Sequence, residues 1–263
     1  MFLKKQLLQY QLSIHKGANM KQGYFKIAEN VKLCENVYKM RLEGDVSSIT
    51  APGQFINIKL DGLYLRRPIS VFDRDEVSVT IIYKVVGKGT EQMSKMKSDE
   101  LDVLTGLGNG YDTSLSGDRP LLLGGGVGVP PLYMLAKKLI SEGKKVSVVL
   151  GFNKKDEIFC EEDFKALGAD VYVTTADGSY GTKGFVTDAM KNIDYSYFYT
   201  CGPEPMLKAI HSVANTSGQL SFEERMGCGF GACMGCSCKT ITGYKRICKE
   251  GPVLKREEIL WEI

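Results

Sequence analysis

Hydrophobic and polar residues alternate along the first half of the chain with the period of two that half-buried strands show. The alternating segments are residues 31–33, 37–42, 55–60 and 77–86. Turn-forming pairs such as Pro52-Gly53 and Asp61-Gly62 separate them. Short strands at this spacing predict a small antiparallel barrel or sandwich, with one short helix between Thr90 and Lys97.

The pattern changes after Asp118-Arg119-Pro120, where short apolar runs begin to alternate with helical periodicity. The predicted strands are residues 121–123, 146–150, 171–175 and 197–200, and the predicted helices are residues 130–140, 164–167, 185–191 and 203–215. Strands that alternate with helices indicate βαβ units and a parallel sheet. Their crossover connections are expected to be right-handed.

Regular periodicity fades from Gln219 onward, and five of the eight cysteines lie between Cys228 and Cys248. The predicted architecture is therefore β followed by α/β, in four segments. They are a disordered leader (1–21), a six-stranded antiparallel β-barrel (22–118), a parallel α/β nucleotide-binding domain (119–218) and a small cysteine module (219–263). Glutamines interrupt the leader, so it is not a signal peptide, and Met20 is a second candidate for the start of translation.

Composition excludes several classes of protein. The chain has 263 residues, a net charge of +3, two histidines and 29 glycines. A nearly neutral chain carries no electrostatic footprint for nucleic acid, and no apolar run reaches the roughly 20 residues of a membrane helix. Two histidines leave little scope for a His-based triad. Without an export signal we expect a cytoplasmic protein, in which clustered cysteines bind metal more often than they form disulfides.

The most specific motif is C-x4-C-x2-C, followed by a fourth cysteine twelve positions later; its members are Cys228, Cys233, Cys236 and Cys248. This spacing is typical of plant-type [2Fe-2S] ligation. Interspersed glycines allow backbone N–H groups to turn toward the sulfurs. A zinc site and a disulfide cluster are the alternatives. Cys238 does not fit the spacing and is interpreted as a non-ligand.

Two glycine-rich segments follow predicted strands of the α/β region. The first contains G-x-G-x-x-P at Gly126, Gly128 and Pro131, and the second is Cys201-Gly202-Pro203. Small residues allow a phosphate to approach the backbone at a helix N-terminus. Because ligands bind outside the carboxyl ends of parallel strands, both segments are predicted to flank one nucleotide; alternatively, the first is only a tight turn and Cys201 a structural thiol.

Two further motifs lie in the barrel region. Arg66-Arg67-Pro68-Ile69-Ser70 offers a guanidinium fork for phosphate and a hydroxyl for a flavin ring. Gly87-Lys88-Gly89-Thr90 precedes the predicted helix, where backbone donors suit a pyrophosphate. Neither motif is specific alone, because charged residues before a strand are commonly just solvated.

Taken together and in this order, the motifs resemble the ferredoxin–NADP reductase-like superfamily, in which a flavin-binding barrel precedes a nicotinamide-binding α/β domain. With the cysteine module, residues 22–263 closely resemble the electron-transfer subunits of dihydroorotate dehydrogenase B. That resemblance implies FAD, one [2Fe-2S] cluster and NAD(H) as substrate. It also implies an FMN-containing dihydroorotate dehydrogenase catalytic subunit as partner, in a heterotetramer with two copies of each chain.

Carried over by position, the resemblance assigns the site residues in three groups. The FAD group is Arg67, Pro68, Ile69, Ser70, Ile82, Tyr83, Lys84, Gly89 and Thr90. The NAD group is Gly126, Gly128, Pro131, Cys201, Gly202 and Pro203, and the cluster group is Cys228, Cys233, Cys236 and Cys248. Cys201, beside the nicotinamide, is the only candidate for a catalytic side chain.

The expected function is an electron relay in de novo pyrimidine (UMP) biosynthesis, in which this subunit does not itself oxidise dihydroorotate. Two alternatives remain open. The chain could serve an NADH-dependent ferredoxin–NADP oxidoreductase or a sulfide dehydrogenase complex, although some of those subunits have aspartate where this chain has Cys228. It could also be a cofactor-free zinc module. The segment after the second strand of the α/β region contains lysines but no arginine, which favours NADH over NADPH.

Overall fold

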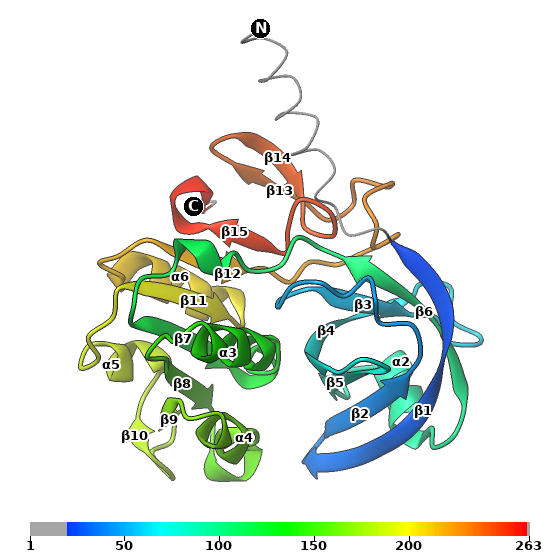
Figure 1. Cartoon of the computed structure of the whole chain (residues 1–263), viewed down its shortest axis with the longest axis horizontal. Helices are drawn as coiled ribbons and strands as arrows, with labels where there is room; N and C mark the ends of the chain where they lie inside the picture. The colour runs from blue at the N-terminus through cyan, green and yellow to red at the C-terminus, as the bar shows by residue number, and fades with distance from the viewer. Residues whose placement is uncertain (1–19, 262–263) are drawn as a thin grey trace, which may run out of the picture.

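The computed structural model describes residues 20–261. A closed barrel and a seven-stranded sheet lie side by side, and the C-terminal segment lies across the end of both (Figure 1). Of the expected leader, residues 1–21, only Met20 and Lys21 lie within the described residues. Of these, Lys21 opens the first strand and pairs with Asp45 at 2.8 Å, so the ordered barrel begins one residue earlier than predicted.

The barrel is antiparallel, in the order β1-β2-β5-β4-β3-β6. Its strands are β1 (Lys21–Cys34), β2 (Val37–Glu43), β3 (Phe55–Ile58), β4 (Arg67–Arg74), β5 (Ser78–Lys84) and β6 (Glu100–Leu107), with helix α2 (Lys88–Lys95) between the last two. Alternate side chains fill the interior, including Met40, Ile56, Val71 and Ile81. The predicted six-stranded barrel is therefore confirmed.

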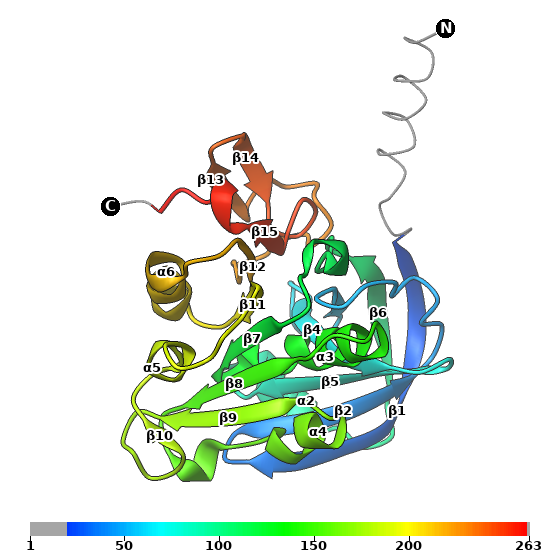
Figure 2. The same ribbon diagram turned by 60° about the vertical axis from the view of Figure 1, so that its left-hand side comes forward.

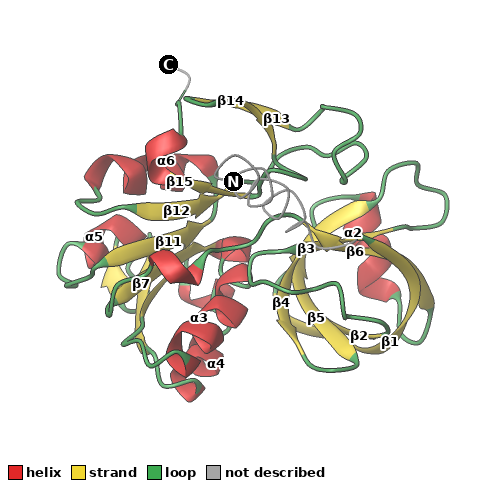
Figure 3. Cartoon of the chain, turned by 45° about the horizontal axis from the view of Figure 1, so that its top comes forward, coloured by secondary structure: helices red, strands yellow, loops and turns green. Residues whose placement is uncertain are grey.

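The larger sheet has the order β10-β9-β8-β7-β11-β12-β15. Its elements, in chain order, are β7 (Pro120–Gly125), α3 (Pro131–Ser141), β8 (Ser147–Phe152), α4 (Glu161–Ala166), β9 (Asp170–Thr175), β10 (Thr182–Lys183), α5 (Val186–Met190), β11 (Tyr197–Cys201), α6 (Glu204–Val213) and β12 (Gly218–Ser221). These strands are mutually parallel, as predicted. Helices α3 and α4 pack on one face and α5 and α6 on the other (Figure 3).

The strand order reverses between β7 and β11. From β7 the chain proceeds outward to β8 and β9, and it then returns to place β11 and β12 on the opposite side of β7 (Figure 2). In open α/β sheets the crevice at such a reversal, outside the carboxyl ends of the strands, is where ligands bind. A nucleotide site is therefore expected between β7 and β11.

The C-terminal segment contains the hairpin β13 (Ser237–Thr240) and β14 (Gly243–Arg246), then β15 (Val253–Lys255). Strand β15 pairs antiparallel with β12, at Leu220 and Leu254 among others. The predicted boundary between residues 218 and 219 therefore falls inside β12 and needs correction. The cause is non-local: β15 covers the otherwise unpaired edge of β12, which the sequence around Gln219 does not reveal.

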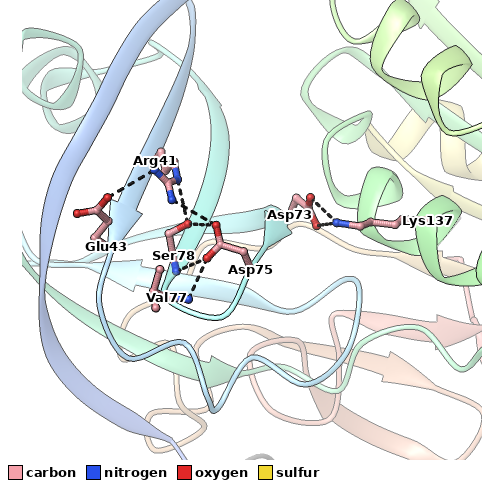
Figure 4. A network of polar contacts seen from close by, with 7 residues as sticks. All are labelled: Arg41, Glu43, Asp73, Asp75, Val77, Ser78 and Lys137. Atoms are coloured by element: carbon pink, nitrogen blue, oxygen red, sulfur yellow. Dashed lines mark hydrogen bonds and ion pairs between the residues drawn. The ribbon is translucent and has the colours of Figure 1, made fainter.

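The barrel and the sheet share an apolar interface. Phe72 of β4 stacks on Tyr133 of α3 with ring centroids 4.2 Å apart, and Ile82 lies in the same buried cluster as Leu132. Lys137 of α3 pairs with Asp73 at 2.8 Å beside this contact (Figure 4). A continuous apolar core fixes the barrel relative to α3, and with it the two halves of the site.

Within residues 20–261 none of the helices has the length and apolar character required to cross a membrane.

Candidate functional site

The two glycine-rich segments of the α/β domain meet at the β7–β11 reversal. A Cβ atom added at Gly128 would lie 2.3 Å from the Cys201 carbonyl oxygen and 2.6 Å from the Gly202 Cα. A Cβ added at Gly202 would likewise lie 2.3 Å from the Met206 methyl carbon. The backbones thus pack directly against each other, and this contact requires a glycine at position 128.

The turn after β7 has the backbone conformation expected of a loop that binds a phosphate. Gly126 has a φ of 52°, a conformation that other residues adopt only at a cost. Pro131 stands in the first turn of α3, where its missing N–H costs nothing. The structure therefore brings the predicted nucleotide residues together at the carboxyl ends of β7 and β11; they are Gly126, Gly128, Pro131, Cys201, Gly202 and Pro203.

Cys201, the only candidate for a catalytic side chain, is a neutral thiol. Burial raises its pKa to about 12, outweighing the opposing hydrogen bond with Ser221. Nearby, the Tyr111 hydroxyl donates to the Thr200 carbonyl at 3.0 Å. A thiol of this kind is a poor nucleophile, and it fits a role in packing beside a bound ring.

The barrel motifs also come together, around Arg67. A Cβ atom at Gly89 would lie 2.2 Å from the Arg67 Nε, so the guanidinium lies against the first turn of α2. Among the described residues, Arg67 donates only to the carbonyls of Leu65 and Arg66. A cation at a helix N-terminus is electrostatically unfavourable unless an anion joins them, and a pyrophosphate is such an anion.

The adjacent Arg66 has a structural role. It binds Asp102 of β6 through both carboxylate oxygens at 3.0 Å and through the backbone carbonyl at 2.9 Å. The pair is largely buried, with side chains 19% and 13% exposed. Arg67 is therefore the arginine of the motif that remains available to a phosphate.

The other predicted FAD residues differ in whether their side chains or only their backbone groups are available to a ligand. Ser70 is half-buried on β4. The Thr90 hydroxyl accepts from the Val86 N–H at 2.9 Å and donates to the Gly87 carbonyl at 3.1 Å. These bonds stabilise the N-terminus of α2. Tyr83 points into the barrel, where its hydroxyl donates to Asn30 at 3.0 Å and burial raises its pKa to about 12. Only its backbone can face a ligand.

The remaining members of the FAD group follow the strands. Pro68 and Ile69 lie on β4 opposite Asn57 and Ile56 of β3, Lys84 is exposed, and Ile82 packs into the interface with the α/β domain. Strands β4 and β5 thus lie on the side of the barrel that packs against the α/β domain.

The cluster cysteines lie in two pairs. The Cys228 N–H points at the Cys233 sulfur at 3.5 Å, and the Cys248 N–H points at the Cys236 sulfur at 3.4 Å. The Ala232 N–H lies 3.2 Å from the Cys228 sulfur. Among residues 20–261, no three His, Cys, Asp or Glu side chains converge as a single metal ion would require. Two pairs of thiols are the arrangement that a two-iron cluster requires, since each iron takes two thiolates.

The loop favours thiolate at its first cysteine. Burial acts to raise the pKa of Cys228, but N–H groups of Phe230, Cys233 and Ala232 outweigh it and lower the pKa to about 6. Burial and the neighbouring Cys236 thiol raise the pKa of Cys248 to about 12. A metal centre ligates thiolates, so part of the loop is already arranged for one.

The second cysteine pair is buried against the barrel. Cys236 and Cys248 pack with Phe55 of β3 and with Leu104 and Leu107 of β6. Cys238 lies on β13 opposite Lys245, and burial raises its pKa. It takes no part in either sulfur pair, and its interpretation as a non-ligand stays a prediction.

One contact of the site was not predicted from the sequence. The Asn57 side chain donates from Nδ2 to the Cys228 carbonyl at 3.3 Å, which ties β3 to the cluster loop. The available signal was a polar residue within the apolar run Phe55-Ile56-Asn57-Ile58, a pattern that becomes informative only once the loop is known to pack there.

Comparison with known families supports this arrangement. Residues 122–212 match the family model of the oxidoreductase NAD-binding domain, and residues 223–260 match that of the iron-sulfur cluster binding domain of dihydroorotate dehydrogenase B. The dihydroorotate dehydrogenase B (NAD(+)) electron transfer subunit of Fusobacterium nucleatum is 47% identical over 250 residues, which cover 89% of this chain and 96% of that protein. The subunit of the same name from Bacillus pumilus is 45% identical over 255 residues, which cover 91% and 98%.

Solved structures share the fold of this chain. The NADH-dependent reduced ferredoxin–NADP oxidoreductase, described for flavin-based electron bifurcation, is similar with a TM-score of 0.83 and 33% identity, covering 90% of each chain. The ferredoxin reductase of carbazole 1,9a-dioxygenase shares the fold, with a TM-score of 0.62, 20% identity, and coverage of 72% of this chain and 64% of that chain.

The fold and the paired cysteines define an NAD-linked oxidoreductase subunit that transfers electrons through a flavin and an iron–sulfur cluster. Within that class, the chain belongs to the family of dihydroorotate dehydrogenase B electron transfer subunits. Its cofactors are FAD and a [2Fe-2S] cluster, and its substrate is NAD(H).

Proposed function

We propose that this chain transfers electrons between an FMN-containing dihydroorotate dehydrogenase catalytic subunit and NAD(+), in a heterotetramer with two copies of each subunit. The supporting observation is the position of the paired cysteines. The buried pair, Cys236 and Cys248, packs against Phe55 of β3 and against Leu104 and Leu107 of β6. Strand β3 in turn pairs directly with β4, which carries Arg67 and Ser70. A flavin on β4 and a cluster on this loop would be separated by a single strand.

The proposed FAD site consists of Arg67, Pro68, Ile69, Ser70, Ile82, Tyr83, Lys84, Gly89 and Thr90. When bound, FAD supplies the exchange between hydride transfer to or from nicotinamide and single-electron transfer. Arg67 and the first turn of α2 would hold the pyrophosphate, because together they form an unneutralised positive site. The backbone of β4 and β5 would hold the ring.

The nucleotide would lie over the β7–β11 crevice, bound by Gly126, Gly128, Pro131, Cys201, Gly202 and Pro203. Gly126, Gly128 and Gly202 carry no side chains, so a phosphate can approach their backbone. Cys201 would pack beside the nicotinamide as a neutral thiol and would not take part in proton transfer.

Cys228, Cys233, Cys236 and Cys248 would ligate the cluster, two to each iron. All eight cysteines are free of disulfides, which is consistent with a reducing compartment, and we propose a cytoplasmic location. The proposed domain limits are 22–118, 119–221 together with 253–255, and the intervening cluster module; the second includes β12 and β15, which complete the sheet.

A second candidate function is that of the corresponding subunit in an NADH-dependent ferredoxin–NADP oxidoreductase, favoured by the 33% identity to such a structure. The relatives named for dihydroorotate dehydrogenase B are more similar, at 41–47%, which supports the first.

Co-purification from the native host distinguishes the two functions. We expect an FMN-bearing subunit that oxidises dihydroorotate, and the mixture should reduce NAD(+) with dihydroorotate while neither chain does so alone. Recovery of a ferredoxin-linked partner, with no dihydroorotate oxidation, would support the second function and contradict the first.

A further inference from the structure

Strand β3 is the only element that separates the predicted flavin strand from the cluster loop, within the part of the chain that is described. Its backbone pairs with β4, Phe55 opposite Ser70 and Asn57 opposite Pro68. Its side chains alternate, so Ile56 and Ile58 fill the barrel while Phe55 packs against the cluster cysteines. Asn57 shares the outer face with Phe55.

Asn57 makes the polar contact between this strand and the first cluster cysteine. It is 1% exposed, and its Nδ2 donates to the Cys228 carbonyl at 3.3 Å. The next residue, Gly229, has a φ of 77°, and a Cβ there would lie 2.3 Å from the same Nδ2. The amide thus fills the space under the Cys228–Gly229 peptide and leaves no room for that segment to move closer to β3.

The same side chain is a poor choice for stability. The Asn57 Oδ1 is buried and has no hydrogen-bond partner, and a buried acceptor without a partner lowers stability. A leucine of similar shape would remove that cost. The hydrogen bond to Cys228 therefore fits a role in positioning the loop better than a role in folding.

We propose that Asn57 is a positioning residue for electron transfer between the flavin and the cluster, holding Cys228 at a fixed distance from β4. This inference rests on the proposed ligand set and FAD site. The step concerned moves one electron from reduced FAD to the oxidised cluster, with NADH as the source of electrons and no bond made or broken in the protein.

The test compares Asn57→Leu with Gln54→Leu in the purified holoprotein. Gln54 is a matched control, since it is also a buried amide (1% exposed) beside β3. Its Oε1 accepts from the N–H groups of Thr50 and Ala51, and its Nε2 donates to the Gly108 carbonyl. None of these residues belongs to the cluster loop. After rapid anaerobic mixing with NADH, absorbance follows flavin and cluster separately. Partners in the shell around metal ligands commonly contribute about 10- to 100-fold, and we expect Asn57→Leu to slow flavin-to-cluster transfer by that factor.

Asn57→Leu should retain FAD, iron and thermal stability but show shifted EPR g-values and faster iron release to a chelator. Gln54→Leu should lose thermal stability and keep wild-type transfer and EPR. Wild-type transfer and EPR in Asn57→Leu would overturn the proposal.

Amide hydrogen exchange of residues 228–232 is the second readout, because it reports on the loop even if Asn57→Leu loses iron. We expect exchange about tenfold faster or more in Asn57→Leu than in Gln54→Leu, and equal exchange would overturn the proposal. Cys233→Ser separates this result from the proposed function. If that variant retains the cluster, the ligand set is wrong; if it loses the cluster while Asn57→Leu behaves as wild type, only the positioning role fails.

Discussion

The contact between Gly128 and the Cys201–Gly202 backbone gives a prediction whose size follows from the structure. In Gly128→Ala the new Cβ would lie 2.3 Å from a carbonyl oxygen and 2.5 Å from its carbon. Ordinary contact begins at 3.4 Å, so one of the two strand ends must move by about 1 Å, and neither is a flexible side-chain tip. Overpacking of this kind costs about 1–3 kcal/mol.

For a chain of this length that cost lowers the Tm by about 2–12 °C. The displaced backbone is also the predicted nucleotide surface, where a misplacement of about 1 Å can cost about 100-fold. We therefore expect NADH to reduce the flavin of Gly128→Ala far more slowly at limiting NADH, whereas dithionite reduces flavin and cluster normally. FAD and iron contents should not change.

Gly23→Ala is the control for this experiment. A Cβ there would lie 3.6 Å from Phe25, an ordinary contact, and alanine in a strand is favoured over glycine by about 0.5–1 kcal/mol. Its Tm should be equal or slightly higher, with wild-type NADH kinetics. A wild-type Tm and NADH response in Gly128→Ala would refute the argument that the two strand ends form one nucleotide site.

Three further predictions concern the other parts of the site. In Gly89→Ala the new Cβ displaces the flexible Arg67 side chain, whose Nε lies 2.2 Å away, and the stability of the fold should be unchanged. Loss of a charge-assisted hydrogen bond, about 1.5–3 kcal/mol, should weaken FAD retention in dialysis by roughly 10- to 150-fold. Full retention of FAD would contradict the assignment of Arg67. Cys233→Ser should abolish the [2Fe-2S] absorbance and EPR signal with FAD retained, while Cys238→Ser should leave both unchanged; loss of the cluster in the latter would make Cys238 a ligand. Folding raises the pKa of Cys201 from 9.0 to about 12, so its contribution to stability is complete below pH 9 and declines as the pH rises toward 12. The free energy of unfolding, measured in urea, should therefore fall more over that range in the wild type than in Cys201→Ala. Parallel pH profiles would contradict a neutral thiol in the folded protein.

Local patterns were sufficient to predict most of the architecture. The barrel strands β2 and β5 alternate clearly, and the βαβ units of the second domain combine apolar strands with helical periodicity. The cysteine spacing could be interpreted because one short loop contributes three of the ligands. In each case the determining residues are neighbours in sequence.

The parts that were not predicted depend on distant contacts. Strands β6 and β12 have weak alternation and are fixed by pairing with β1, β3 and β11. Strand β15 is defined by the edge that it covers. Asp102 accepts hydrogen bonds from Arg66, 36 residues away in the sequence, and Asn57 donates to the Cys228 carbonyl, 171 residues away. No local pattern could reveal these pairs.

A flavin and a two-iron cluster held one strand apart would exchange electrons that come from NADH. EPR of the anaerobically purified protein after reduction with NADH tests it most directly. We expect the signal of a reduced [2Fe-2S] cluster, in proportion to bound iron and acid-labile sulfide, with the flavin absorbance bleached in the same sample. A protein whose flavin is bleached by NADH without any cluster signal, or whose cysteines hold zinc, would contradict the account.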